Sequence, residues 1–474
     1  MFRVDAGRTS GYCDGIDRRS FVQLGMAGMA SLGLADLLRA RDASVTAGSP
    51  AQDAAAGTAP QGTRAAKDTS VILIWLDGGP SHIDLYDLKP EAPAEYRGIW
   101  SPIHTNVPGF DISELFPMQA RCADKFSIIR SLHHDSGDHF TGGHWMLTGR
   151  GGVSGANNSG QYPFIGAVAT KVTGPRRPGL PAHVAVPYAS SIGLRPGYFG
   201  GNYLGNEHNP FETDGDPNGA KFSVKNLQVP KGLTLDRLED RRGLLAHFDR
   251  LRRDADASHT FDAMDRFQLA AYELTASAKS AELFDLTREA EPTRERYGRN
   301  TWGQSTLLAR RLVEAGCTFV TVHCAGWDHH WDLKAGMERY LPQIDRLVSA
   351  LFEDLHERGL SEKVMVLLCG EFGRTPKMND GGNGGPAGSK GTPGRDHWGN
   401  AMCCLIGGGG VKGGRIIGST DARAEVPKDR PLTPGDLHAT MFRVLGVDPQ
   451  TITTDHSGRP IPAVPDGEAI SELF

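Results

Sequence analysis

The chain lacks long apolar runs, an excess of one charge and a pattern of cysteines. The apolar segment at residues 23–38 is shorter than the roughly 20 residues that a membrane-spanning helix needs. The net charge is only -5 over 474 residues. The sequence shows neither a basic region for nucleic acid nor an acidic tail. The seven cysteines show no spacing typical of a disulfide framework or a zinc ribbon. These shortages argue against an integral membrane protein, a nucleic-acid-binding protein and a disulfide scaffold.

The N-terminal residues differ in pattern from the rest of the chain. Arg18 and Arg19, within DRRSFV at 17–22, precede the weakly apolar segment, and this arrangement resembles a twin-arginine export signal. An amphipathic helix with a chance arginine pair is the alternative. We therefore predict a signal peptide at 1–42, a linker or cleavage region at 43–68, rich in Ala, Gly, Thr and Ser, and a large domain at 69–474. Export by the twin-arginine machinery implies a periplasmic or secreted protein without a stable membrane span after signal removal.

Short apolar runs alternate with helical patterns along the large domain. Strands are expected at 71–76, 126–129, 183–186, 318–322, 364–369 and 401–406. Apolar residues recur every three or four positions at 340–358 and through a predicted helical insertion at about 231–312. Residues 143–148 are apolar enough for a short helix. This alternation predicts an α/β fold with a mostly parallel central sheet and helices on both faces.

Polar side chains follow the predicted strands where each one ends. Asp77 follows the first strand, and a segment at 133–144 rich in His and Asp follows the second. Asp328 and His330 follow a later strand, and Glu371 and Arg374 follow the run at 364–369. Ligands of open α/β sheets bind beyond the carboxyl ends of strands. A glycine-rich loop at 381–394, predicted to be mobile and to lie over the site, separates this region from Asp396 and His397.

Carboxylates and imidazoles without thiolates suit a divalent metal, with zinc or manganese favoured and magnesium or calcium allowed if carboxylates dominate. Two such ions roughly 4 Å apart would clamp the attacking and leaving oxygens of a phosphoryl or sulfuryl transfer, and Arg374 could bind the remaining anionic oxygens. Each residue also has an ordinary alternative. Asp77 could be a turn former, Glu371 an ion-pair partner of Arg374, and His397 a histidine stacked on Trp398. Asp328 and His330 could belong to a hydrogen-bonded loop capped by Trp327 and Trp331.

Several motifs together resemble the bacterial family called domain of unknown function 1501. They include GGPSHIDLYDLKP at 78–90, HHDSGDHFTGGHWMLTGR at 133–150, GWDHH at 326–330, GEFGRTP at 370–376 and GRDHWGN at 394–400. The resemblance covers nearly all of residues 69–450. That family is similar to the sulfatase and alkaline phosphatase superfamily, which implies an alkaline-phosphatase-like sheet, a metal site at the strand ends and hydrolysis of phosphate or sulfate esters.

Carried over by position, the resemblance implies five metal ligands: Asp77, Asp328, His330, Glu371 and His397. The LTGR motif of sulfatases is kept at 147–150, whereas their nucleophile motif is missing and its position falls on His139. A formylglycine sulfatase is therefore disfavoured. Ser81 and Thr141 are the hydroxyl candidates for a nucleophile. Alternatively, metal-activated water attacks, with His139 or His144 as general acid or base.

The leading prediction is an exported metal-dependent hydrolase of phosphate or sulfate esters, including esters on polysaccharides, whose partner would be an anionic ester or a sulfated or phosphorylated glycan. The missing nucleophile motif favours an alternative of another class. In that case the chain would be a catalytically silent member of the fold that binds an anionic glycan or another envelope component.

Overall fold

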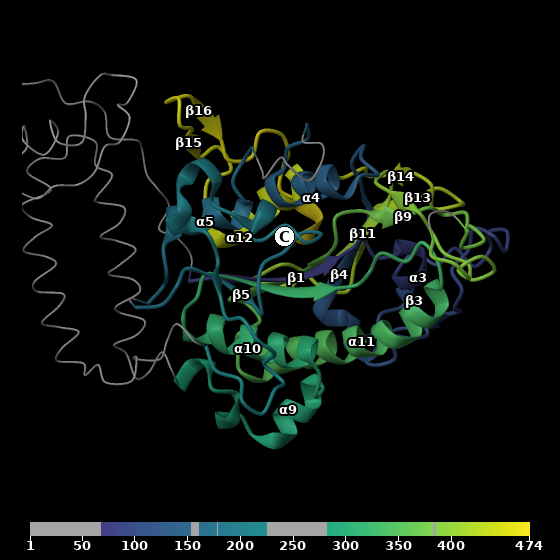
Figure 1. Ribbon diagram of the computed structural model, residues 1–474, viewed down its shortest axis with the longest axis horizontal. Coiled ribbons are helices and arrows are strands. Elements are labelled where there is room, and N and C mark those ends of the chain that lie inside the picture. The colour runs from purple at the N-terminus through teal and green to yellow at the C-terminus, as the bar shows by residue number, and fades with distance from the viewer. Residues whose placement is uncertain (1–67, 153–160, 178, 225–281, 383–384) are drawn as a thin grey trace, which may run out of the picture. The chain divides into compact units, whose positions relative to one another are not determined.

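The computed structural model describes residues 68–152, 161–177, 179–224, 282–382 and 385–474 (Figure 1). The chain divides into two units, Met1–Gly62 and Thr63–Phe474, and the description below concerns the second. The predicted signal peptide, nearly all of the linker and the larger part of the predicted helical insertion lie outside the described residues. They stay predictions.

An eight-stranded sheet forms the centre of the described unit, in the order β12-β4-β11-β8-β1-β7-β5-β6. Its central strand β1 pairs in parallel with β7 and β8, whereas β11 runs antiparallel to both β4 and β8. The predicted mostly parallel sheet is confirmed. The strands are β1 Ser70–Asp77, β4 Phe126–Leu132, β5 His183–Val186, β6 Phe211–Glu212, β7 Phe319–Ala325, β8 Val364–Cys369, β11 Met402–Gly408 and β12 Ile416–Ile417.

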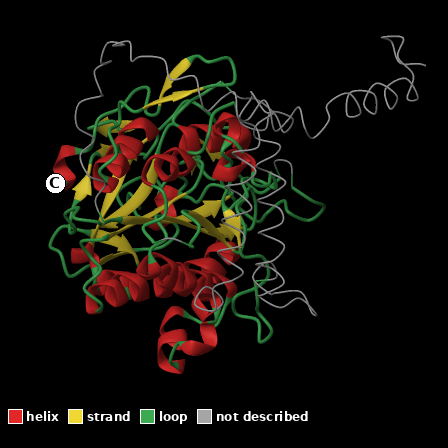
Figure 2. Cartoon of the chain, turned by 90° about the vertical axis from the view of Figure 1, so that its left-hand side faces the viewer, coloured by secondary structure: helices red, strands yellow, loops and turns green. Residues whose placement is uncertain are grey.

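Helices cover both faces of this sheet, as Figures 1 and 2 show. Strand β1 is buried along its whole length, as expected for a parallel strand between two helical layers. Its residues alternate between two hydrophobic clusters, with Ile72 and Ile74 on one side and Val71 and Leu73 on the other. One layer contains α9 Glu291–Tyr297, α10 Thr301–Ala315 and α11 Leu333–Glu357; the other contains α4 His139–Thr148, α5 Ile165–Thr173 and α12 Pro434–Leu445.

The described end of the predicted insertion, residues 282–312, contains α9 and most of α10. Helix α10 packs against β7 and β1, so it belongs to the core layer that leads into β7. Shorter elements lie around the core: α3 His82–Leu85, and the pairs β2 Pro102–His104 with β3 Asp111–Ser113, β9 Gly373–Arg374 with β10 His397–Trp398, β13 Ser419–Thr420 with β14 Pro427–Asp429, and β15 Ile452–Thr454 with β16 Pro460–Pro462.

Helix α4 begins four residues earlier than predicted, at His139 instead of Gly143. Asp138 caps it, because its Oδ1 accepts a hydrogen bond from the Thr141 N–H at 2.9 Å. Glycine weakens a helix interior, which hid this first turn from sequence reasoning. Here Gly143 is required for packing, since a Cβ at this position would lie 2.6 Å from Ser191 Oγ. The early start places His139 in the first turn of the helix.

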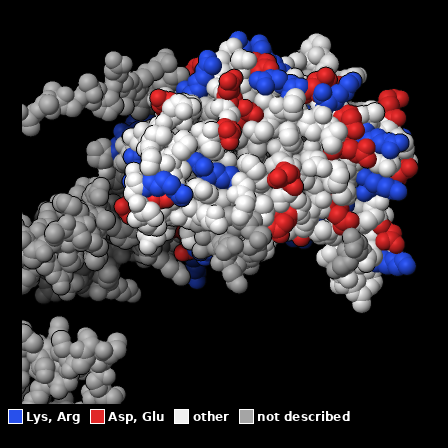
Figure 3. All heavy atoms as spheres, turned by 90° about the horizontal axis from the view of Figure 1, so that it is seen from above, with Lys and Arg blue, Asp and Glu red and all other residues white. Residues whose placement is uncertain are grey.

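Within the described residues, no helix is long and apolar enough to cross a membrane. On the face seen in Figure 3, acidic and basic residues are interspersed. The described residues on that face form no patch of one sign of the kind that nucleic acid requires.

Candidate metal centre

The candidate site lies where β7, β1 and β8 end, because these neighbouring parallel strands share one edge. Asp77 is the last residue of β1, Asp328 follows β7, and Glu371 follows β8. His397 precedes β11, but this strand runs antiparallel to β8, so its beginning lies at the same edge. The β9–β10 pair fixes His397 opposite Arg374.

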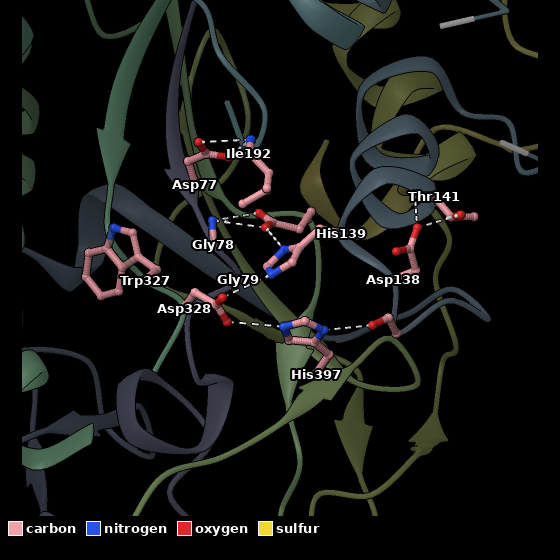
Figure 4. Close-up of polar contacts among 12 residues, drawn as sticks. Asp77, Gly78, Gly79, Asp138, His139, Thr141, Ile192, Trp327, Asp328 and His397 are labelled. Atoms are coloured by element: carbon pink, nitrogen blue, oxygen red, sulfur yellow. Dashed lines mark hydrogen bonds and ion pairs between the residues drawn. The ribbon is translucent and has the colours of Figure 1, made fainter. Parts of the chain in front are cut away.

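The carboxylate of Asp328 is the centre of a cluster of three imidazoles and one guanidinium. Figure 4 shows two of the imidazoles, His139 and His397, beside it. Its Oδ1 lies 3.0 Å from His330 Nε2 and 3.1 Å from His397 Nε2, and its Oδ2 lies 3.3 Å from His139 Nε2. The Arg374 guanidinium donates to Oδ1 at 2.7 Å. Burial alone would raise the pKa of Asp328, but the contacts with the three imidazoles, together with the Arg374 charge, hold it far below its usual range.

Each of the three imidazoles is held from its Nδ1 side, which turns Nε2 toward Asp328. The Nδ1 contacts are His139 with Glu371 Oε1 (2.7 Å), His330 with Asp396 Oδ1 (2.6 Å) and His397 with the Gly137 carbonyl (2.9 Å). The Nε2 atoms of His330 and His397 lie 2.8 Å apart. Carboxylate–histidine pairs of this kind orient metal-binding histidines in many proteins.

The residues present fit a divalent metal. One donor atom each from His139, Asp328 and His397 lies within 4.8 Å of the others, and His139 Nε2 is buried without a hydrogen-bond partner among the described residues. Burial lowers the pKa of His139, but Asp328 and Glu371 outweigh it and raise the pKa to about 9. A cation is therefore favoured at this nitrogen. Two imidazoles and a carboxylate suit zinc or manganese better than magnesium or calcium.

Arg374, predicted to bind the substrate anion, is fully buried. Besides Asp328, its guanidinium donates to the carbonyls of Gly79 at 2.7 Å, Trp327 at 3.3 Å and Gly78. Arg374 thus ties the loop after β1 to the loop after β7. These contacts support Asp328 directly and point the guanidinium into the protein.

Asp77, predicted as a metal ligand, accepts two hydrogen bonds from the Ile192 N–H, at 3.0 and 3.2 Å. Its Oδ2 lies 3.0 Å from His323 Nε2, and Trp75 Nε1 donates to Oδ1 at 3.3 Å. The described contacts of Asp77 therefore anchor the segment around Ile192. Sequence reasoning missed His323 because it lies inside β7, where no loop signal marks it.

Glu371, also predicted as a ligand, contacts His139 on the side opposite Asp328. Its two oxygens accept hydrogen bonds from the Gly78 N–H at 2.9 and 3.1 Å. Burial raises the pKa of Glu371, and the hydrogen bond with His139 opposes this effect.

The predicted nucleophile and acid–base candidates have other partners. Ser81 is buried, and its hydroxyl donates to Asp84 Oδ2 at 2.5 Å. Thr141 donates through Oγ1 to Asp138 at 3.0 Å and lies beside Asp138 in Figure 4. His144 Nδ1 donates to the Arg150 carbonyl at 2.6 Å, and burial lowers the pKa of His144 to about 4.

The described part of the glycine-rich loop is attached to the site. Asn379 and Gly394 form an isolated backbone bridge, and the Arg395 N–H donates to the His329 carbonyl at 3.0 Å. A Cβ on Gly394 would lie 2.1 Å from the carbonyl carbon and oxygen of His330, so only glycine permits this approach. The loop therefore contacts the segment that carries Asp328 and His330, and its mobility stays a prediction.

Comparison with known proteins adds a family and several distant structures. A family model described as "Protein of unknown function (DUF1501)" matches residues 68–474, and no curated protein matches in sequence. Similar solved structures include the PsFucS1 sulfatase from Pseudoalteromonas sp. (13% identity, TM-score 0.37, covering 80% of this chain and 68% of that chain). A second is the phosphonate monoester hydrolase of Agrobacterium radiobacter (11% identity, TM-score 0.37, covering 85% of this chain and 77% of that chain). A third is Ps i-CgsB in complex with k-i-k-neocarrahexaose (10% identity, TM-score 0.35, covering 81% of this chain and 73% of that chain). At these values the likeness is distant.

Proposed function

This chain belongs to the DUF1501 family of proteins of unknown function, as its motifs indicated, and we propose that it is a metal-dependent hydrolase of phosphate or sulfate esters. One observation carries the proposal. Three imidazole Nε2 atoms lie within 3.3 Å of a single carboxylate, that of Asp328, at the carboxyl edge of the central strands. These donors suit a divalent metal, which His139, Asp328 and His397 would bind.

A divalent metal, when bound, lowers the pKa of water and offsets negative charge on ester oxygens. Substrate could reach the centre, because the side chain of Asp328 is 43% exposed and that of His397 is 21% exposed. His139 is the first residue of α4, so the positive end of this helix dipole also lies at the centre and favours an anionic substrate. Since Ser81 and Thr141 direct their hydroxyls to Asp84 and Asp138, we propose water as the nucleophile.

His330 completes the proposed centre. Its Nδ1 is held by Asp396 and its Nε2 faces both Asp328 and His397, so it lies beside the proposed metal position. We assign Arg374 to the support of Asp328, because its nitrogens donate to that carboxylate and to buried carbonyls. The proposed location is outside the cytoplasm and the proposed substrate is an ester on an anionic glycan. Both depend on the export signal predicted at 1–42.

Metal analysis and an ester screen test the function together. Protein purified without chelators should contain zinc or manganese and hydrolyse at least one ester among aryl phosphates, phosphonate monoesters, aryl sulfates and sulfated oligosaccharides. His397→Ala should lose both metal and turnover. The matched control, His104→Ala, changes a histidine whose side chain is 94% exposed and should retain both. A folded wild-type protein that binds no divalent metal and turns over none of these esters would refute the proposal.

A further inference from the structure

We propose that Glu371 is the positioning carboxylate of a single-metal centre: it holds His139 with Nε2 toward the metal and does not bind the metal itself. This inference rests on the proposed function and deepens it. It also differs from the sequence-based expectation, which made Glu371 a metal ligand.

The contacts of Glu371 lock it in place. Its side chain is fully buried, and both oxygens accept from the Gly78 N–H, at 2.9 and 3.1 Å. Its main-chain carbonyl accepts from His134 Nε2 at 2.6 Å, and a Cβ on Gly142 would lie 3.2 Å from that oxygen. The loop after β1, the loop after β4 and helix α4 therefore all hold this residue. A rigid acceptor of this kind orients its partner strongly.

That partner is His139, whose Nδ1 lies 2.7 Å from Glu371 Oε1. A carboxylate only accepts hydrogen bonds, so the imidazole carries a proton on Nδ1. The lone pair of Nε2 is then directed at Asp328 Oδ2, 3.3 Å away, and Nε2 has no hydrogen-bond partner among the described residues. When Nε2 is unprotonated, two electron-rich atoms face one another at this distance, so a cation between them is favoured. In the metal-free protein that cation is a proton on Nε2, and a metal ion bound by both atoms would replace it.

The same geometry separates Glu371 from the metal position. The imidazole of His139 contacts Glu371 through Nδ1 and Asp328 through Nε2, so its ring lies between the two carboxylates. Donor atoms of His139, Asp328 and His397 lie within 4.8 Å of one another, and His330 Nε2 lies 3.0 Å from Asp328 Oδ1 and 2.8 Å from His397 Nε2. Glu371 does not belong to this group of described residues. Asp77 is likewise engaged by Ile192 and His323. One ion is therefore expected.

Zinc titration of the full chain tests this assignment. The wild type should bind one equivalent, and Glu371→Gln should still bind one equivalent but with about 10- to 100-fold weaker affinity, the range typical of lost outer carboxylates. His397→Ala should abolish binding, and Glu91→Gln, at an exposed position, should leave it unchanged. In the zinc-loaded wild type, long-range ¹H–¹⁵N spectra should show His139 protonated at Nδ1 and metal-bound at Nε2, a signature that general destabilisation does not produce.

Several results would overturn the assignment. Zinc affinity of Glu371→Gln equal to wild type would remove the positioning role, and complete loss as in His397→Ala would make Glu371 a ligand. Two equivalents in the wild type would contradict a single-metal centre. If Glu371→Gln does not fold, the wild-type spectra still decide, because metal-bound Nδ1 on His139 contradicts the assignment. A wild type that binds no zinc refutes the proposed function as well, whereas normal zinc binding with an unaffected variant refutes this inference alone.

Discussion

Raising the pH of the metal-free protein should destabilise it through His139. The pKa of this imidazole is about 9 in the folded protein, against an ordinary value of 6.5. Because the folded pKa is the higher one, the protonated imidazole stabilises the fold fully below pH 6.5, and this contribution is lost as the pH rises through about 9. At 1.36 kcal/mol per pH unit, the difference corresponds to about 3 kcal/mol. The physical cause is the pair of carboxylates, Asp328 and Glu371, between which the ring lies.

Urea unfolding of chelator-treated protein at pH 6, 7.5 and 9.5 measures this loss. His330 has a raised pKa and His397 a lowered one, so their effects on the pH dependence have opposite signs. The difference between wild type and His139→Gln isolates the imidazole of interest. The free energy of unfolding should fall by about 3 kcal/mol more in the wild type than in the variant over this range. His104→Gln, at an exposed position, should follow the wild type. Parallel curves for wild type and His139→Gln would refute the reasoning.

Three further predictions concern the metal and its supports. Zinc at 100 times its Kd should raise the free energy of unfolding by about 2.7 kcal/mol, seen as a higher urea midpoint, and His397→Ala should abolish the gain. Zinc affinity, measured by competition with a chromophoric chelator, should increase about tenfold per pH unit between pH 7 and 8.5, because His139 must release its proton to bind the metal; a flat profile would contradict this. Arg374→Met should lower the free energy of unfolding by about 3 kcal/mol, since it leaves buried carbonyls unpaired and removes the guanidinium partner of Asp328. Arg430→Met, at a position 43% exposed, should cost under about 1 kcal/mol, and equal losses in the two variants would show that burial of Arg374 is not the cause.

The fold was predictable because its central strands are mainly apolar and buried. Strand β8 has the predicted bounds, and β1 and β5 differ from prediction by at most one residue at each end. The predicted beginning of helix α4 was wrong, since its glycines are selected by contacts with distant segments: Gly142 faces Phe372 and Glu371, and Gly143 faces Ser191 and Tyr198. No local pattern reports such a contact, so a helix with two interior glycines looks like a loop to sequence reasoning.

The sequence predicted which site residues lie near one another, but not how their side chains are oriented. Strands that share an edge bring their terminal residues together, which is why Asp328, His330 and His397 were expected near one another and do lie together. The sequence does not say which way a side chain turns within that neighbourhood. Arg374 follows a strand as an anion-binding residue would, yet its guanidinium donates to the buried carbonyls of the loops after β1 and β7. Asp77 ends β1 but is engaged by Ile192, whose position depends on a long segment without a recognisable pattern.

The position of His397 shows how topology determines the centre. A residue that precedes a strand lies at the opposite edge from residues that follow parallel strands, and His397 precedes β11. It reaches Asp328 because β11 runs antiparallel to β8, which reverses the edge, and because the β9–β10 pair fixes it opposite Arg374. An all-parallel sheet of the same strands would have placed this imidazole at the far edge. The proposed metal ligands therefore come from three segments: the first turn of α4, the loop after β7 and the residues before β11. Only the folded sheet brings these segments together, so metal binding should depend directly on the integrity of the sheet.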